Sequence, residues 1–417
     1  MEKHNKIGTV PSGWKMKKLK DVFYINESSL PSNTPADYQF RYITIEQVST
    51  NHIDFGNCET FRFSDAPGRA RRIVRDKDIL ISGVRPNLKS FAIFNNPDAG
   101  NWICSTGFFV LTAKNEDDNL ISYYELLSEI GERQFYSYVA GSNYPAIGDS
   151  DIRNIRLVLP SSVKEKTAIA NILSKVDEAI AAVQGSIAAA ERLKKSLMQN
   201  LLTGRMKPDG TLRKEEEFYM DEKFGKVPKG WHWGKLSEVA EIIAGQSPQG
   251  EFYNDEGVGT PMLNGPTEFT DEYPIPVQWT KKVTKLCKKG DILFTVRGSS
   301  TGRMNFADQE YCIGRGLAAI RPKHDGNIQF LYYTLTRISE MILAEAKGAG
   351  TTFPNVSRGD LLKKVILIPT NQNEIIQPIV EIAYLIKSKQ QKIAILERLK
   401  KSLMQNLLTG RVRVNNK

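Results

Sequence analysis

The sequence is poor in the residues that build redox, metal and membrane sites. Its 417 residues include four cysteines and four histidines, scattered without a CxxC pair or a metal-ligand spacing. Cys58, Cys104, Cys287 and Cys312 therefore predict neither a disulfide framework nor a metal site. No run of about 18 apolar residues occurs, and the first residues lack the apolar segment typical of a signal peptide. We expect a cytoplasmic protein with reduced, structural thiols.

Several catalytic signatures are also missing. A DNA adenine methyltransferase needs an Asn/Asp-Pro-Pro-aromatic tetrapeptide to hold the flipped base, and the chain has no Pro-Pro pair. Residues 83–90 match the P-loop pattern GxxxxGK[ST] except that Leu88 replaces the second glycine, on which the phosphate-binding turn depends. No HExxH, GxSxG or nuclease-like acidic cluster is present. The chain is therefore not expected to be an enzyme on its own; an enzyme with an unrecognised site is the alternative.

The composition is that of a globular protein with an excess of positive charge. Hydrophobic residues make up 41% and charged residues 25%, which is an ordinary balance for two or three domains. The net charge of +10 favours polyanionic partners, nucleic acid before an acidic membrane surface.

The most informative feature is an identical repeat of fifteen residues. ERLKKSLMQNLLTGR occupies 191–205 and again 397–411, 206 residues further on. Its leucines recur every fourth residue, which places them on one stripe of an α-helix. The Thr-Gly at the end of each copy predicts a helix stop, because glycine adopts the left-handed cap without strain.

Other motifs recur in the same order. Val-Pro-x-Gly-Trp occurs at 10–14 and 227–231, and Asp-Ile-Leu at 78–80 and 291–293. The offset falls from 217 to 206, so intervening loops differ in length. The chain is a tandem duplication of one unit.

Each unit is predicted to contain a strand-rich, mixed α/β domain followed by a long helix. In the first copy we predict strands at 41–45, 78–81, 108–111 and 155–159 and a helix at 120–131, whose counterpart is 330–346. The predicted boundaries are 1–160 for the first α/β domain, 161–206 for the first long helix, 207–225 for a linker, 226–370 for the second α/β domain, 371–411 for the C-terminal long helix and 412–417 for a tail.

The two long helices carry an apolar seam with alternating spacings of four and three, as a coiled coil requires. Because such a rod is unstable alone, we expect the two copies to pair antiparallel with pseudo-twofold symmetry. Two helices that each pack on their own domain are the alternative. Pro378 predicts either the start of the second helix or a kink. Residues predicted to form the seam and the subunit-docking surface are Leu173, Val176, Ile180, Ile187, Leu193, Leu197, Leu201, Ile379, Ile386, Ile393, Leu399, Leu403 and Leu407.

Basic loops punctuated by glycine surround the Asp-Ile-Leu strand in both copies. Arginine and lysine there could neutralise phosphates, and arginine or asparagine could contact base edges. A second pair of polar and aromatic loops lies at 141–147 and 348–355. The alternatives are a solvated charged face for the first pair and tight structural turns for the second. The candidate DNA-binding residues are Arg69, Arg71, Arg72, Arg85, Asn87, Lys89, Asn143, Tyr144, Arg297, Ser299, Ser300, Arg303, Thr351 and Thr352.

The repeated order of Val-Pro-x-Gly-Trp, Gly-Asp-Ile-Leu or its variant, and a helix ending in Leu-Met-x-x-Leu-Leu-Thr-Gly resembles the specificity subunit of type I restriction–modification systems over essentially the whole chain. The resemblance implies two target recognition domains joined by antiparallel spacer helices. It further implies binding to double-stranded DNA, two docked modification subunits with S-adenosylmethionine, and restriction subunits that use ATP and magnesium. This chain would bind no cofactor itself.

These inferences predict an asymmetric bipartite DNA site whose half-sites lie about one helical turn apart. A coiled-coil adaptor that binds no DNA is the alternative. Two identical partner subunits would need two identical docking surfaces, which gives the repeat a physical motive; recent recombination between the copies would also keep them identical.

Overall fold

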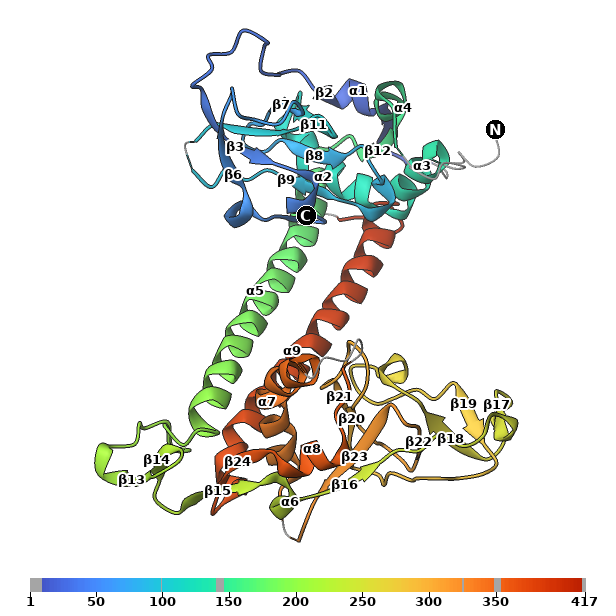
Figure 1. Cartoon of the computed structure of the whole chain (residues 1–417). Helices are drawn as coiled ribbons and strands as arrows, with labels where there is room; N and C mark the ends of the chain where they lie inside the picture. The colour runs from blue at the N-terminus through green and yellow to red at the C-terminus, as the bar shows by residue number, and fades with distance from the viewer. Residues whose placement is uncertain (1–9, 99, 140–145, 325, 349–353, 415–417) are drawn as a thin grey trace. The chain divides into compact units, whose positions relative to one another are not determined.

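The computed structural model describes residues 10–98, 100–139, 146–324, 326–348 and 354–414. The chain forms two compact units, residues 1–185 with 391–417 (unit 1) and residues 186–390 (unit 2) (Figure 1). Each unit holds one α/β domain and parts of both long helices, α5 (Val163–Leu201) and α9 (Gln372–Leu407).

The main sheet of unit 1 is antiparallel, with strand order β2-β11-β8-β9. All four residues of β8 (Ile79–Ser82) are buried, which explains why this segment lacks apolar/polar alternation. Ile79 and Ile81 pack into the core beneath α2 and α3, whereas Leu80 packs into the core beneath the second sheet. The strand thus lies between two cores.

The second sheet of unit 1 has the order β6-β3-β10-β7, in which β3 and β10 are parallel. A separate pair joins β1 to β12 with Trp14 opposite Pro160. The elements of the domain are β1 Trp14–Lys18, α1 Leu19–Val22, β2 Phe23–Ile25, β3 Gln39–Ile43, β4 Val48–Ser49, β5 His52–Ile53, β6 Glu59–Arg62, β7 Ala70–Ile73, β8, β9 Phe91–Ile93, β10 Trp102–Ser105, β11 Phe108–Ala113, α2 Glu116–Leu127, α3 Glu129–Val139, α4 Asp149–Asn154 and β12 Arg156–Pro160.

Unit 2 repeats this plan. Its main sheet has the order β16-β23-β20-β21, its second sheet β17-β19-β18-β22 with β18 and β22 parallel, and β15 pairs with β24 so that Trp231 lies opposite Pro369. Its elements are β13 Phe218–Asp221, β14 Gly225–Pro228, β15 Trp231–Lys235, α6 Leu236–Val239, β16 Ala240–Ala244, β17 Tyr253–Asn254, β18 Thr260–Leu263, β19 Gln278–Thr280, β20 Ile292–Thr295, β21 Met304–Phe306, β22 Cys312–Ile313, β23 Leu317–Pro322, α7 Ile328–Gly348, α8 Arg358–Lys363 and β24 Val365–Pro369.

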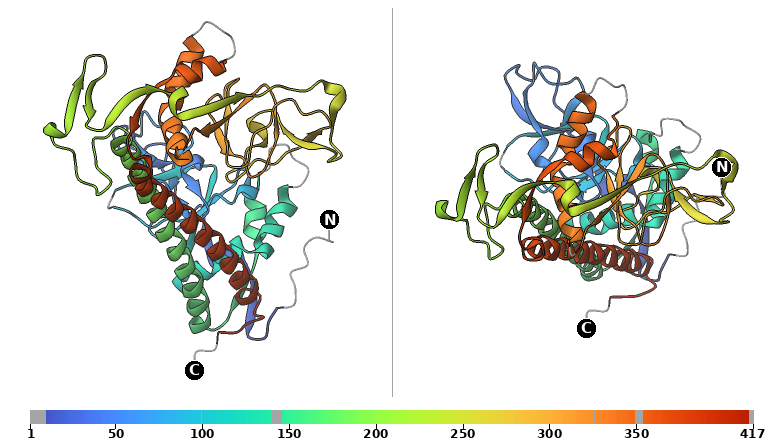
Figure 2. Two further views of the ribbon diagram at one scale, coloured as in Figure 1. Left: turned by 90° about the horizontal axis from the view of Figure 1, so that it is seen from below. Right: turned by 60° about the horizontal axis from the view of Figure 1, so that its bottom comes forward.

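The long helices run antiparallel. In unit 1 the first turns of α5 lie beside the last turns of α9 (Figures 1 and 2), and Leu173 shares a core with Leu407. In unit 2 the end of α5 and the beginning of α9 share the other core, through Leu201 and Ile379. The predicted architecture of two tandem α/β domains joined by two long antiparallel helices is confirmed.

Three details differ from the predictions. The helix α9 begins at Gln372, so Pro378 lies in its second turn and does not start it. A β-hairpin crosses the predicted end of the linker at residue 225, with β13 inside the linker and β14 running into the second domain. The Tyr219 hydroxyl anchors it by donating to the Trp231 carbonyl at 3.0 Å. The predicted helix at 120–131 breaks at Ser128, whose hydroxyl donates to the Glu125 carbonyl at 2.6 Å and accepts from the Gly131 N–H at 3.2 Å.

Candidate nucleic-acid interface

In unit 1 the two predicted loops meet at the end of β8. Val84 forms a β-bridge with Ala146, and the Ile147 N–H donates to the Gly83 carbonyl at 2.9 Å. Asn143 and Tyr144 fall outside the described residues. The basic loop that follows β8 and the segment that precedes α4 therefore form one surface.

Unit 2 brings its own two loops together at the equivalent position. Arg297 bridges Asn355, and the Val356 N–H donates to the Val296 carbonyl at 2.9 Å. Thr351 and Thr352 fall outside the described residues. Loops separated by some sixty residues in the sequence thus converge in the same way in both units, as their shared place in the repeat suggests.

The predicted arginines of unit 1 have different environments. Arg69 and Arg85 are exposed. Arg71 stacks over Phe63 with its guanidinium carbon 4.7 Å from the ring centroid and donates to the Ala70 carbonyl. Nε of Arg72 is buried without a hydrogen-bond partner among the described residues. Arg69 and Arg85 are therefore the groups best placed to contact a ligand.

Arg85 has an unusual backbone. Its φ of 48° is left-handed, and it precedes the short 3-10 helix that contains Asn87. The equivalent residue of unit 2 is Gly298, with φ 84°. Arg85 therefore adopts a backbone conformation that favours glycine and is strained for other residues. Strained residues of this kind cluster at functional sites.

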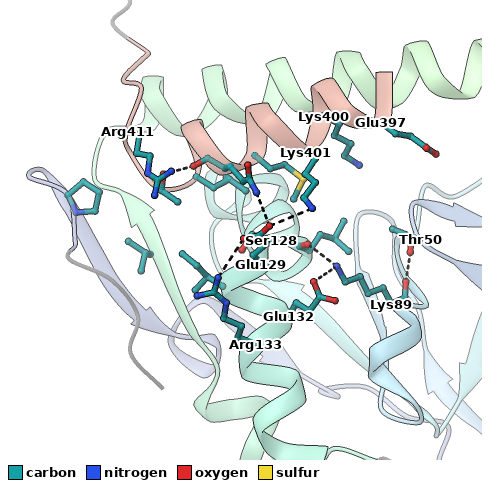
Figure 3. Close-up of a pocket in the computed structure, with 18 residues that line it drawn as sticks. Thr50, Lys89, Ser128, Glu129, Glu132, Arg133, Glu397, Lys400, Lys401 and Arg411 are labelled. Atoms are coloured by element: carbon teal, nitrogen blue, oxygen red, sulfur yellow. Dashed lines mark hydrogen bonds and ion pairs between the residues drawn. The ribbon is translucent and has the colours of Figure 1, made fainter. Parts of the chain in front are cut away.

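Lys89 lies elsewhere, in a cavity of about 900 Å³ in unit 1 (Figure 3). Its ammonium group is 3.0 Å from the Glu132 carboxylate and within 3.5 Å of the Leu127 carbonyl. The structure thus gives Lys89 an internal ion-pair partner, and its contact with DNA stays a prediction.

The predicted residues of unit 2 form a compact turn between β20 and β21. Arg297, Ser299 and Arg303 are exposed and Ser300 is half-buried. The Arg303 guanidinium donates to the Phe269 carbonyl at 3.3 Å, and the Arg303 backbone N–H donates to the Ser300 carbonyl at 3.0 Å. Arg297 is the exposed cation at the bridge to Asn355 itself.

A third turn completes each loop cluster and was missed from the sequence. In unit 1 the turn between β10 and β11 contains Thr106, whose N–H donates to the Arg69 carbonyl at 2.8 Å. In unit 2 the turn between β22 and β23 contains Arg315, which is exposed. Its glycine-flanked sequence, Gly-Arg-Gly, was the available signal.

The identical repeat ends each long helix against the Val-Pro-x-Gly-Trp motif of the same unit. A Cβ on Gly410 would lie 2.6 Å from Pro11, and one on Gly204 would overlap Pro228. Lys400 lies over Tyr124 in unit 1, and Lys194, its equivalent, lies over Tyr333 in unit 2. Part of the repeat is therefore an intramolecular contact, made twice.

The predicted docking leucines differ in exposure along the repeat. Leu201 and Leu407 are buried in the unit cores, whereas Leu193 is 48% exposed and Leu399 is 46% exposed. Among the other predicted seam residues, Leu173 is fully buried and Val176 and Ile386 are nearly so. The half-buried residues are Ile180, Ile187, Leu197, Ile393 and Leu403. Of these predicted residues, Leu193 and Leu399 are the pair that leaves an apolar surface exposed at equivalent positions.

The cavity that contains Lys89 borders the second copy of the repeat. Figure 3 shows Lys401 of α9 directed toward Glu129. The Gln405 amide donates to the same carboxylate at 2.7 Å. Apolar side chains from Leu127, Ile130, Met404 and Leu408 also line it. Five cationic and three acidic side chains line the cavity, and two of the cations, Lys89 and Lys401, lie against Glu132 and Glu129.

The cysteine thiols and the potential metal ligands among the described residues give no sign of a catalytic or metal site. Burial raises the pKa of the Cys58 thiol to about 11 and that of Cys287 to about 12, which keeps both protonated. Among the described residues no group of three or more His, Cys, Asp or Glu side chains could hold a metal ion, and no helix is long and apolar enough to cross a membrane.

Comparison with known proteins agrees with this arrangement. The family model described as "Type I restriction modification DNA specificity domain" matches residues 11–192 and 228–409. The chain belongs to this family. The role of the family is DNA sequence recognition within type I restriction–modification systems, and the adaptor alternative is not favoured.

Individual relatives cover nearly the whole chain. A Methanocaldococcus jannaschii chain described as a type I restriction enzyme specificity subunit is 30% identical over 99% of this chain and 96% of its own length. A chain solved in a study of complex assembly and conformational transition of the type I R-M system is 26% identical, with a TM-score of 0.58 over 97% of this chain and 100% of that one. The S subunit from M. genitalium shares the fold at 15% identity, with a TM-score of 0.58 and complete coverage of both chains.

Proposed function

We propose that this chain recognises an asymmetric, bipartite DNA sequence, with the loop cluster of unit 1 contacting one half-site and that of unit 2 the other. The observation that carries the proposal is one loop architecture built twice with different side chains. Val84 meets Ala146 in unit 1, and Arg297 meets Asn355 in unit 2. Equivalent scaffolds with unlike side chains would contact unlike bases.

The exposed arginines supply the contacts that such binding needs. Arg69 and Arg85 in unit 1 and Arg297 in unit 2 are exposed beside the converging loops. Contacts to phosphates position a protein on the duplex, and contacts to base edges provide sequence discrimination. Binding through these arginines should weaken steeply with salt because each neutralised phosphate releases counterions.

The partners would be two modification subunits and the restriction subunits. The identical repeats support two equivalent docking positions, since Leu193 and Leu399 are exposed at the same place in each copy. S-adenosylmethionine, ATP and magnesium would be bound by these partners, where methyl transfer and cleavage would occur.

The proposal is tested by expressing the chain with its modification subunit and mapping methylated adenines by sequencing. We expect one asymmetric motif of two defined half-sites separated by unspecified bases. A palindromic or continuous motif would contradict the proposal.

Salt dependence separates DNA recognition from the adaptor alternative. The complex should retard duplexes that contain the motif. The logarithm of its binding constant should fall linearly with the logarithm of the salt concentration. An assembled complex that retards no DNA even at low salt would support the adaptor.

A further inference from the structure

The turn between β22 and β23 has the geometry of a rigid platform for one side chain. Gly314, Arg315, Gly316 and Leu317 form a β-turn in which the Leu317 N–H donates to the Gly314 carbonyl at 3.0 Å. Arg315 occupies the second position of the turn and is exposed. Among the described residues its guanidinium has no hydrogen bond or ion pair.

Neighbouring segments hold this turn on two sides. The Gln246 N–H donates to the Ile313 carbonyl and the Gly245 N–H to the Leu317 carbonyl, both at 2.9 Å. The Arg315 N–H itself donates to the Ser247 hydroxyl at 3.2 Å. The backbone of Arg315 is therefore fixed while its side chain is free.

The two flanking glycines are required by close approach. A Cβ on Gly314 would lie 2.6 Å from the Asn264 side-chain oxygen, and a Cβ on Gly316 would overlap the Asn264 carbonyl. No larger residue fits on either side of the arginine. Such a turn loses little conformational entropy when its arginine binds, which favours specific contacts.

The position of this turn links it to the loop cluster of unit 2. The Val296 N–H, directly before Arg297, donates to the Gly316 carbonyl at 2.9 Å. On the other side lies Asn264, whose backbone N–H is capped by the Glu268 carboxylate and whose amide donates to Gln278 at 3.1 Å. Arginine and amide side chains, the groups that recognise guanine and adenine edges, therefore lie in adjacent turns.

We propose that Arg315 is a specificity-determining residue of unit 2, contacting a guanine edge in the half-site that this unit binds. The inference rests on the proposed function and adds to it one residue and one base. The equivalent residue of unit 1 is Thr106, which cannot make the bidentate contact. Arg315 thus contributes to the asymmetry between the half-sites.

The test uses the complex of the full chain with its modification subunit. Three variants are compared: Arg315→Ala, Arg315→Lys, and Lys289→Ala as a control. Lys289 is exposed in the turn before β20, whereas Arg297 follows β20 at the other end of the strand, whose four residues span roughly 13 Å. Methylated motifs are sequenced, and equilibrium binding is measured on the wild-type motif and on each single-base variant of it.

We expect Arg315→Ala to relax one guanine position in one half-site, with discrimination there falling about tenfold to a hundredfold. Arg315→Lys should keep the salt dependence of binding yet lose part of that discrimination, because an ammonium on a flexible stem lacks the planar, pre-organised fork of a guanidinium. Lys289→Ala should leave the motif unchanged. Unaltered thermal unfolding of the Arg315 variants would show that the turn remains folded.

An unchanged motif for Arg315→Ala would overturn the inference, and so would a uniform loss of affinity for every sequence, which indicates a phosphate contact. Both results would leave the proposed function intact, provided that the wild-type complex methylates a bipartite motif. Failure of the wild-type complex to methylate such a motif would instead refute the proposed function.

Discussion

Units 1 and 2 build the same helix junction with different chemistry. In unit 1, Asp118 of α2 is buried and accepts hydrogen bonds from Lys166, near the start of α5, and from Lys17. At the equivalent place in unit 2 the Asn327 N–H donates to Gln372 at 2.9 Å, and its amide donates to Asn373 at 2.6 Å. Ion pairs in one unit thus correspond to amide hydrogen bonds in the other.

At a second buried position the ion pair lies in unit 2 and the neutral hydrogen bond in unit 1. Asp291 of unit 2 is paired bidentately with Arg321, at 2.6 and 3.0 Å. Its equivalent, Asp78, accepts a hydrogen bond of 2.7 Å from the neutral Thr112 hydroxyl. Burial raises the pKa of Asp78 even though this bond and the Arg75 N–H oppose the shift. The fold therefore fixes where a polar group is buried and leaves open which partner satisfies it.

The largest difference in stability between the units is expected when the buried Asp118 carboxylate of unit 1 is removed. Asp118→Ala leaves the Lys166 ammonium buried without a counterion and should destabilise unit 1 by about 3–5 kcal/mol. Asn327→Ala in unit 2 should cost only about 1 kcal/mol, because a neutral hydrogen bond contributes less. Hydrogen exchange resolved by unit measures both effects, and equal losses would contradict the comparison.

The next effect concerns pH. Burial raises the pKa of Glu125 to about 8, and one of its oxygens has no hydrogen-bond partner in the described part of the chain. Its equivalent in unit 2 is the neutral Thr334. The pKa is higher in the folded state, so the neutral form stabilises unit 1 at low pH. That stability is lost as pH rises from the unfolded value, about 4.3, through 8.

Glu125→Gln should therefore stabilise unit 1 by a few kcal/mol more at pH 9 than at pH 5. Thr334→Val in unit 2 should have the same effect at both pH values. Urea unfolding at the two pH values checks this, and a pH-independent effect of Glu125→Gln would show that Glu125 is not buried as an acid.

A smaller effect should be equal in both units. Gly204 and Gly410 end the long helices with φ of 67° and 65° and pack on Pro228 and Pro11. Alanine at either position would be strained and crowded, at a cost of about 1–3 kcal/mol in the unit that contains it. Thermal unfolding of the two single variants should give matching losses, whereas a loss in only one would show that the repeat is not used equivalently.

The smallest difference concerns the lysines of the repeat. Lys400 is 2.5 Å from the Asp177 carboxylate, whereas burial lowers the pKa of Lys194 and the residue equivalent to Asp177 is Ala383. Lys400→Ala should cost about 1 kcal/mol and Lys194→Ala close to none. Denaturant midpoints of the two variants provide the measurement. A larger loss of stability for Lys194→Ala than for Lys400→Ala would contradict the predicted difference between the units.

Much of the fold could be predicted because its signals are local. The duplication, the long helices and the buried strand at Ile79 follow from repeats and apolar spacing. The hairpin of β13 and β14 was missed because its four-residue strands lack clear alternation and depend on the tertiary contact of Tyr219 with Trp231. The break at Ser128 depends on side-chain hydrogen bonds that interrupt an otherwise continuous helical pattern.

The candidate interface was only partly predictable. Charge and glycine placed Arg85 and Arg297 in equivalent loops, but the β-bridges that join these loops to a second segment are tertiary. The same holds for Arg315, since only the folded chain shows Gly316 bonded to Val296. For Lys89, charge predicted a DNA contact but could not reveal its internal partner, Glu132.

The most direct test of the central claim is to map the methylated motif of the complex with Arg85→Ala and, separately, with Arg297→Ala. If two diverged loop clusters each contact one half-site, Arg85→Ala will relax bases in one half only and Arg297→Ala in the other half only. Both variants relaxing the same half, or neither changing the motif, would contradict the account.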